Sequence, residues 1–150
     1  MIQRKFLVVN GPNLGHLGAR QPEIYGHLGM ERLPELIREI MGSRAQELSL
    51  DFFHGNGEGQ IIDRLELARD EGVHGVVLNA GAYTHTSLAI ADCLAWIGIP
   101  CVEVHLSNVL SRDPVRHNSV IGRHCIGVIS GFGLLSYALA VQALWNTVQD

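Results

Sequence analysis

The chain has 150 residues, of which 47% are hydrophobic and 17% are charged, and its formal net charge at pH 7 is -4. That length fits one domain with a full apolar core. The mild negative charge argues against nucleic acid or an anionic membrane as the main partner, because both select for clustered Lys and Arg.

The sequence shows no sign of a targeting or membrane segment. Its first apolar run ends at Asn10 and is too short for a signal peptide, and no later stretch reaches membrane-span length. Cys93, Cys101 and Cys125 form no CxxC pair and no metal-finger spacing, so we interpret them as buried small apolar residues in a reducing compartment. We therefore expect a soluble, cytoplasmic protein.

The first half of the chain alternates strand and helix patterns. A buried strand is indicated over 6–9, and an amphipathic helix over 33–47, where apolar residues recur at helical spacing. A second strand follows over 48–53 and a second helix around 61–68. The irregular stretch over 11–29 has a length that is typical of a functional lid or a disordered loop.

The second half continues the alternation. It predicts a third strand over 73–78, a third helix over 87–96 with Thr84 or a nearby hydroxyl as N-cap, and a fourth strand over 101–104. The last two predicted elements are a fifth strand and a closing helix, over 126–129 and 134–148.

These elements together predict the fold class. Strands that are apolar on both faces and separated by helices require a parallel sheet that is covered on both sides. Five parallel strands with about five helices predict an α/β, flavodoxin-like doubly wound sheet. Because no linker or internal repeat interrupts the pattern, we assign residues 1–150 to a single catalytic domain.

Polar residues gather where three of the predicted strands end. Ligands of open α/β sheets bind outside the carboxyl ends of the strands. Polar residues at one strand end are explained by a turn, because Asn and Gly favour turns, but polar residues at three strand ends together predict a small-molecule site. The residues at these ends are Asn10, Asn13, Asn79, Glu103, His105, Ser107 and Asn108.

Glu103 and His105 are two residues apart on a predicted strand, so their side chains share a face. A carboxylate beside an imidazole favours the protonated ring and fixes its orientation, which suits a general acid. The spacing fits an ordinary satisfied polar pair equally well. A metal site that adds His85 and Asp92 is a further reading, but no fixed-spacing signature such as HExxH supports it.

The irregular stretch carries Arg20 and Tyr25. A nearby guanidinium stabilises a phenolate, which allows a tyrosine to act as a base near neutral pH. The glycines of this stretch form neither GxGxxG nor a P-loop, so a nucleotide site is not indicated. Arg112 and Arg116 either bind a carboxylate of a ligand or are solvated surface residues.

Three blocks of the sequence stand out by their order and spacing. They are N-G-P-N-L-G-H-L-G-A-R-Q-P-E-I-Y-G over 10–26, L-N-A-G-A-Y-T-H-T-S over 78–87, and V-E-V-H-L-S-N over 102–108. With G-V-I-S-G-F-G over 127–133 and Tyr137, they resemble the type II 3-dehydroquinate dehydratase family nearly end to end. The blocks are highly specific together, although no single one would be.

The resemblance implies a flavodoxin-like fold and dehydration of 3-dehydroquinate to 3-dehydroshikimate in the shikimate or quinate pathway, with no metal and no organic cofactor. It implies that Tyr25 removes the proton alpha to the ketone and that Arg20 keeps Tyr25 ionised. His105, oriented by Glu103, would protonate the leaving hydroxyl, and Asn13 would position a water near the enolate.

The resemblance also implies the substrate-binding residues. Those for the substrate hydroxyls and, through backbone N–H groups, for its carboxylate are Asn79, His85, Arg116, Leu106 and Ser107. We group Asp92 with them, because it matches a residue that reaches the site of a neighbouring subunit in a family that forms dodecamers from trimers.

The chain departs from the family pattern in two places. Residues 53–60 are Phe-His-Gly-Asn-Gly-Glu-Gly-Gln, where the family usually has a Gln-Ser-Asn-His-Glu-Gly-Glu-like run, and Ala91 stands where an arginine is common. None of the residues assigned to chemistry is missing. The alternatives are a non-catalytic ligand-binding paralogue on the same fold and a metal-dependent hydrolase that uses His85 and His105.

Overall fold

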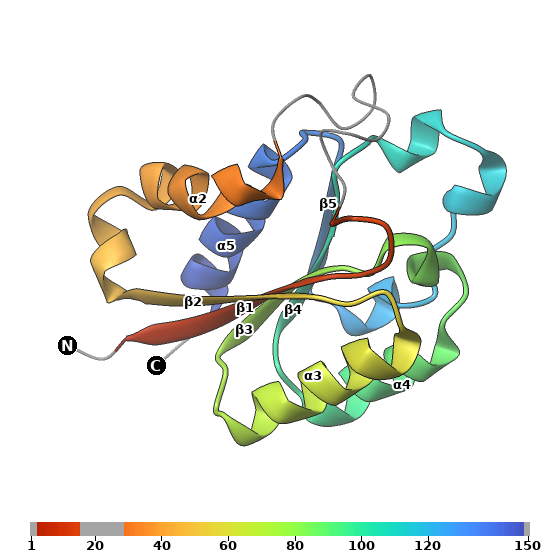
Figure 1. Cartoon of the computed structure of the whole chain (residues 1–150), viewed down its shortest axis with the longest axis horizontal. Coiled ribbons are helices and arrows are strands. Elements are labelled where there is room, and N and C mark those ends of the chain that lie inside the picture. The colour runs from red at the N-terminus through yellow and green to blue at the C-terminus, as the bar shows by residue number, and fades with distance from the viewer. Residues whose placement is uncertain (1–2, 16–28, 149–150) are drawn as a thin grey trace.

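In the computed structural model, which describes residues 3–15 and 29–148, five parallel strands form one sheet in the order β2-β1-β3-β4-β5 (Figure 1). This order is flavodoxin-like, and it confirms the predicted α/β class. The strands are β1 (Arg4–Asn10), β2 (Leu48–His54), β3 (Gly75–Asn79), β4 (Cys101–His105) and β5 (Gly127–Ser130).

Four α-helices in the described part of the chain cover the two faces of the sheet, two on each (Figure 1). One face carries α2 (Leu33–Met41) and α5 (Leu135–Thr147), and the other carries α3 (Glu58–Asp70) and α4 (Leu88–Ile97). Short 3-10 helices fill several connections: η1 (Met30–Arg32), η2 (Gly42–Glu47), η3 (Gly81–His85), η4 (Val109–Ser111), η5 (Pro114–Arg116) and η6 (Gly122–His124).

Two apolar layers hold these helices on the sheet. Successive side chains of a strand point to opposite faces, so each central strand feeds both layers. In β1, Phe6 and Val8 pack with α2 and α5, whereas Leu7 and Val9 pack with α3 and α4. The central strands are therefore mainly apolar on both faces, which is the pattern from which a doubly covered sheet was predicted.

The predicted helix over 33–47 is too long. The α-helix ends at Met41, because Gly42 adopts a φ of +60° that an α-helix cannot continue through, and residues 42–47 form η2 instead. The cap of α4 is the hydroxyl of Ser87, which accepts a hydrogen bond from the Ile90 N–H at 2.9 Å. Thr84 is buried, and its hydroxyl has no hydrogen-bond partner among the residues that the structure describes.

The three cysteines are free, as predicted. Cys93 and Cys101 are buried and Cys125 is half-buried. Burial and the charge of Glu66 raise the pKa of the Cys93 thiol to about 11, so this thiol stays protonated.

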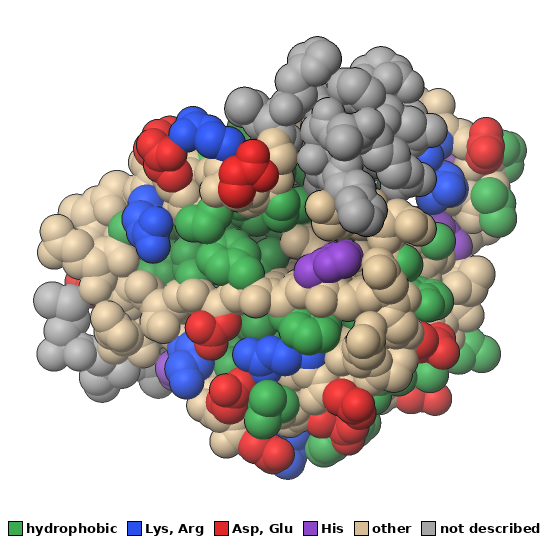
Figure 2. All heavy atoms as spheres, viewed as in Figure 1, with side chains coloured by type: hydrophobic (Ala, Val, Ile, Leu, Met, Phe, Trp, Pro, Cys, Tyr) green, Lys and Arg blue, Asp and Glu red, His purple; other side chains and the backbone are tan. Residues whose placement is uncertain are grey.

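The two tryptophans lie on opposite sides of the sheet. Trp145 of α5 is covered by the guanidinium of Arg4, 4.3 Å from the ring centre, whereas Trp96 of α4 is 53% exposed. In Figure 2, charged side chains of both signs gather over α3, and apolar side chains are uncovered between α2 and β2. No helix in the described ranges is long and apolar enough to cross a membrane.

Candidate active site

A pocket lies where β1, β3 and β4 end, at the point where the strand order reverses. Chain segments diverge from the sheet at such a point and leave a crevice between them. The residues that line the pocket are Pro12, Asn13, Leu14, Asn79, Gly81, Ala82, His85, His105, Leu106, Ser107, Val109, Arg112 and Arg116.

His105 lines this pocket, and Glu103 holds its ring from behind. The Glu103 Oε2 lies 2.6 Å from the His105 Nε2, and only 2% and 6% of the two residues are exposed. The other carboxylate oxygen, Oε1, accepts a hydrogen bond from the Ser119 hydroxyl at 2.6 Å. With Nε2 held by the carboxylate, Nδ1 is the ring nitrogen that His105 can offer to a ligand.

The charge of Glu103 is stabilised by its neighbours. Burial by itself raises the pKa of this carboxyl, but hydrogen bonds from His105 and Ser119 and the positive charges of His105 and His85 outweigh burial and lower it. Glu103 is therefore ionised at neutral pH, which suits a residue that holds an imidazole in place.

His85 lies beside this pair, at the end of η3. Its ring stacks on that of His105, with the ring centres 6.3 Å apart and an angle of 18° between the planes. The His85 Nδ1 is 2.7 Å from the carbonyl oxygen of Asn118, and a carbonyl only accepts, so Nδ1 carries the proton. This leaves Nε2 as the ring nitrogen that His85 can offer to a ligand.

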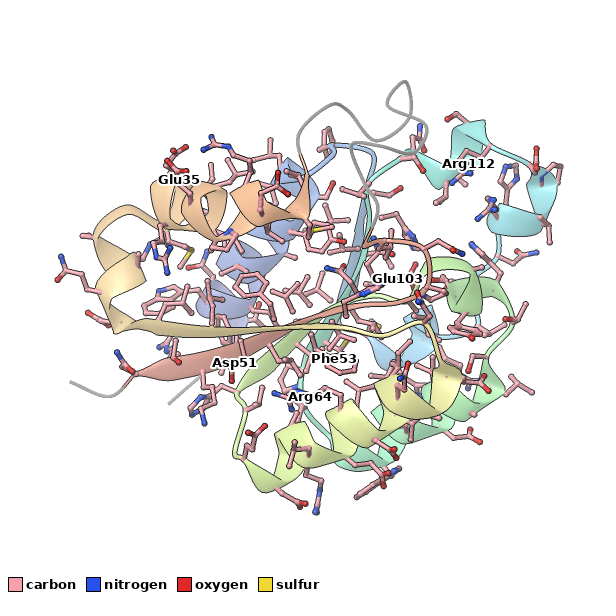
Figure 3. All side chains as sticks on the ribbon, viewed as in Figure 1. Glu35, Asp51, Phe53, Arg64, Glu103 and Arg112 are labelled. Atoms are coloured by element: carbon pink, nitrogen blue, oxygen red, sulfur yellow. The ribbon has the colours of Figure 1, made fainter. Side chains whose placement is uncertain are left out.

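Two arginines also line the pocket. Arg112 and Arg116 come from the segment after β4, and the Arg112 guanidinium donates to the Ser107 hydroxyl at 3.4 Å. Figure 3 shows this arrangement, with Glu103 inside the sheet and Arg112 on the segment that extends beyond it. Since the described lining contains two arginines and no Asp or Glu, the pocket favours a small anion.

The loop after β1 is fixed against the turn after β3. Gly11 lies so close to Ala80 that a Cβ atom at position 11 would be 2.6 Å from the Ala80 carbonyl oxygen. Asn13 adopts a left-handed φ of 68°, which asparagine tolerates, and its N–H donates to the Asn56 side chain at 3.1 Å. These contacts hold Asn13 at the pocket.

The structure brings most of the predicted site residues together. Glu103 lies directly behind His105 and contacts it, whereas Asp92 is exposed on α4 and does not line this pocket. Arg20 and Tyr25 lie outside the described residues. The predicted residues that line the pocket are Asn13, Asn79, His85, His105, Leu106, Ser107 and Arg116.

Two residues at the site were not predicted from the sequence. Ser119 donates to Glu103 from 16 residues away, and Asn56 accepts from Asn13 from 43 residues away. Neither carries a local motif that points to these partners. Among the described residues, no group of three or more His, Cys, Asp or Glu lies close enough together to hold a metal ion.

The family model of the class II dehydroquinases matches residues 4–145. The chain belongs to the class II dehydroquinase family. Class II dehydroquinases are 3-dehydroquinate dehydratases of type II, so this chain is a hydro-lyase of the shikimate pathway. The resemblance inferred from the three sequence blocks is confirmed.

Individual class II dehydroquinases are similar over nearly their full length. A 3-dehydroquinate dehydratase of an Exiguobacterium strain is 49% identical over 149 residues, which are 97% of this chain and 99% of the relative. That of Caldicellulosiruptor saccharolyticus is 48% identical and covers 94% of this chain and 96% of its own. The crystal structure of the type II dehydroquinase from Butyrivibrio crossotus is 43% identical, with a TM-score of 0.88 over 95% of this chain and 97% of that one.

Proposed function

We propose that the pocket at the ends of β1, β3 and β4 removes water from 3-dehydroquinate through an enolate intermediate, with Tyr25 as the base and His105 as the acid. The observation that supports this most is the His105 ring, which a buried carboxylate holds at the wall of a pocket with two arginines. An elimination of this kind needs a base on one side of the substrate and an acid on the other.

The reaction proceeds in two proton transfers. The Tyr25 phenolate takes the proton alpha to the ketone, and the electron pair of the broken C–H bond forms the enolate. The enolate then restores the ketone, forms the carbon–carbon double bond and breaks the C–O bond to the beta hydroxyl. His105 donates a proton to the departing oxygen, which leaves as water, and solvent returns the proton from Tyr25 to His105.

The other predicted residues bind the substrate or stabilise charge. Arg20 keeps Tyr25 ionised, and Asn13 positions a water at the enolate oxygen, where fixed dipoles stabilise negative charge. The backbone N–H groups of Leu106 and Ser107 take the carboxylate. Hydrogen bonds to the substrate hydroxyls come from Asn79, His85 and Arg116. None of these steps uses a metal or an organic cofactor.

We also propose that copies of the chain assemble, with α4 of one copy against β5 of the next. Leu88, Asp92 and Trp96 lie four residues apart on α4 and are exposed, Leu88 at 69%. Beside β5, a second pocket adjoins the first and shares His85, His105 and Arg116 with it. Its apolar residues include Val128, Ile129, Phe132 and Leu139.

These two surfaces are complementary. The apolar residues of α4 match the apolar part of the β5 pocket, and Asp92 would lie near Arg116 of the neighbouring copy. When two different surfaces of identical copies meet, the copies can close into a ring such as a trimer. The family resemblance extends this proposed trimer to a dodecamer of four trimers. Asp92 would then serve the site of a neighbour rather than its own.

The one sheet and its two helical layers support the proposal that residues 1–150 are a single catalytic domain. A reducing compartment such as the cytoplasm suits the three free thiols. We expect the enzyme to act there on 3-dehydroquinate alone, without nucleic acid or membrane as partner.

The proposed function is tested by adding 3-dehydroquinate to the purified, chelator-treated protein and following the absorbance of the conjugated product. We expect turnover to survive the chelator. Binding without product would indicate the non-catalytic paralogue, and loss of turnover that added metal restores would indicate metal-dependent chemistry.

Tyr25→Phe tests the assignment of the base. This variant keeps the ring and removes only the proton-accepting oxygen, so turnover should be lost while substrate binding stays nearly intact. Tyr83→Phe removes a hydroxyl that lies outside the pocket and donates to the Asn56 carbonyl, so it should lower turnover far less than Tyr25→Phe. Normal turnover by Tyr25→Phe would show that another group is the base.

A further inference from the structure

Tyr137 of α5 is fully buried and connects two asparagines at the edge of the pocket. Asn10 and Asn79 are the last residues of β1 and β3 and lie opposite each other in the register of the two strands. The Tyr137 hydroxyl is 2.9 Å from the Asn79 Nδ2 and 2.6 Å from the Asn10 Oδ1. One phenol from a helix therefore joins the ends of two neighbouring strands.

The hydrogen bonds that join Gly81, Asn79, Tyr137 and Asn10 form a network, and one backbone group sets the direction of each of them. The Gly81 N–H can only donate, and its acceptor is the Asn79 Oδ1 at 3.1 Å. The Asn79 amide therefore turns its Nδ2 to Tyr137, whose oxygen accepts. The single hydroxyl proton of Tyr137 then goes to Asn10, where the oxygen of the amide accepts it.

This arrangement fixes what Asn79 offers to the pocket that it lines. One hydrogen of Nδ2 is used by Tyr137, and the second remains for a ligand. Without the phenol oxygen, the amide would lose the anchor on its nitrogen and could rotate away from this direction. We propose that Tyr137 is a positioning residue, which locks Asn79 as a hydrogen-bond donor toward a hydroxyl oxygen of the substrate.

The phenol has the properties that this role requires. Burial raises the pKa of Tyr137 far above its ordinary value of 10, although the hydrogen bond from Asn79 opposes this, so the hydroxyl keeps its proton at every working pH. A buried hydroxyl destabilises a core unless it is hydrogen-bonded, and a phenylalanine would fill the same space among the apolar residues of α5. The hydroxyl is therefore explained by the two amides that it connects.

This inference rests on the proposed function, because it assumes that Asn79 binds the substrate. The test compares Tyr137→Phe with Val141→Ala, a core change one turn further along the same helix. With 3-dehydroquinate, we expect Tyr137→Phe to raise KM about five- to tenfold and to change kcat by less than about twofold. Val141→Ala should lower thermal stability and leave KM unchanged.

A double-mutant cycle separates positioning from a merely structural role. If Tyr137 acts through Asn79, Tyr137→Phe should raise KM by less than about twofold in an Asn79→Ala background. Equal effects in both backgrounds, or an unchanged KM in the single variant, would overturn the proposal. Absence of turnover in the unmodified protein would instead overturn the proposed function, and the positioning role with it.

A second variant covers the case in which Tyr137→Phe does not fold. Asn10→Leu removes the acceptor of the Tyr137 hydroxyl proton and leaves the phenol in place. The hydroxyl proton would then be free to turn toward Asn79 and disturb its amide, so KM should rise in the same direction. A folded Asn10→Leu protein with an unchanged KM would also count against the proposal.

Discussion

The carboxylate behind His105 should control how well this ring donates a proton. Glu103→Gln keeps the size and one acceptor oxygen, but it removes the charged partner that orients the His105 ring. We expect kcat to fall about 100-fold, within the usual range for general acid catalysis, with little change in KM. Steady-state kinetics with 3-dehydroquinate measure this, and a kcat near that of the unmodified protein would rule out the orienting role.

The same carboxyl group should also affect stability at acid pH. Its pKa in the folded protein lies below its ordinary value of 4.5, so its contribution to stability is complete above about pH 4.5 and is lost as the pH falls through the lowered value. Glu103→Gln cannot titrate and should lose less stability between pH 6 and pH 3. Urea unfolding at several pH values measures the difference, and parallel curves for the two proteins would contradict it.

Part of the site could be predicted residue by residue, because position on a strand carries information. Glu103 and His105 are two residues apart on β4 and therefore share a face, and Asn79 is the last residue of a buried strand. Ser119 could not be predicted, since it reaches Glu103 through the irregular path of the segment after β4. The path of an irregular segment depends on tertiary packing, and it produces no periodic pattern of apolar residues from which it could be predicted.

At the scale of the elements, the strands were predictable because every central one is buried on both faces. Helix ends were less so. Residues 42–47 contain Ala45 at helical spacing from Met41 and no proline, and α2 ends because the backbone of Gly42 adopts a positive φ. Glycine is tolerated within helices as well as after them, so its presence alone does not fix the boundary.

The cap of α4 gives a prediction at this scale. Ser87→Ala removes the acceptor for the Ile90 N–H and the hydroxyl that donates to Glu58, so it should lower the free energy of unfolding by about 1–2 kcal/mol. Chemical denaturation measures this. Thr86→Ala, at the exposed neighbouring position, should change stability by less than about 0.5 kcal/mol. Equal effects of the two changes would mean that Ser87 is not the cap.

At the scale of the whole molecule, the α4 surface should determine assembly. Leu88→Glu places a charge on the exposed apolar stripe opposite the apolar part of the proposed partner surface, and it should shift the protein to smaller species. Sedimentation velocity measures this, with Leu67→Glu, the same change at an exposed position of α3, as the control. If assembly fails, kcat/KM should fall with it, because Asp92 would no longer reach a neighbouring site.

An unchanged size distribution in Leu88→Glu would place the contact between copies elsewhere. The sequence alone could not indicate this surface, because an exposed apolar stripe on a helix is recognised only once the fold shows which side faces the core. The prediction of a dodecamer therefore came from the family resemblance and not from the pattern of α4.

The placement of the two tryptophans makes the protein its own optical reporter. Trp145, in the last helix, is covered by Arg4 of the first strand, so its emission should shift when the protein unfolds. Trp96 lies on the other side of the sheet, on the helix surface proposed to meet a neighbour, so its emission should respond to dilution. Replacing either indole with phenylalanine would leave a single emitter, and unfolding and dissociation could then be recorded separately without any added dye.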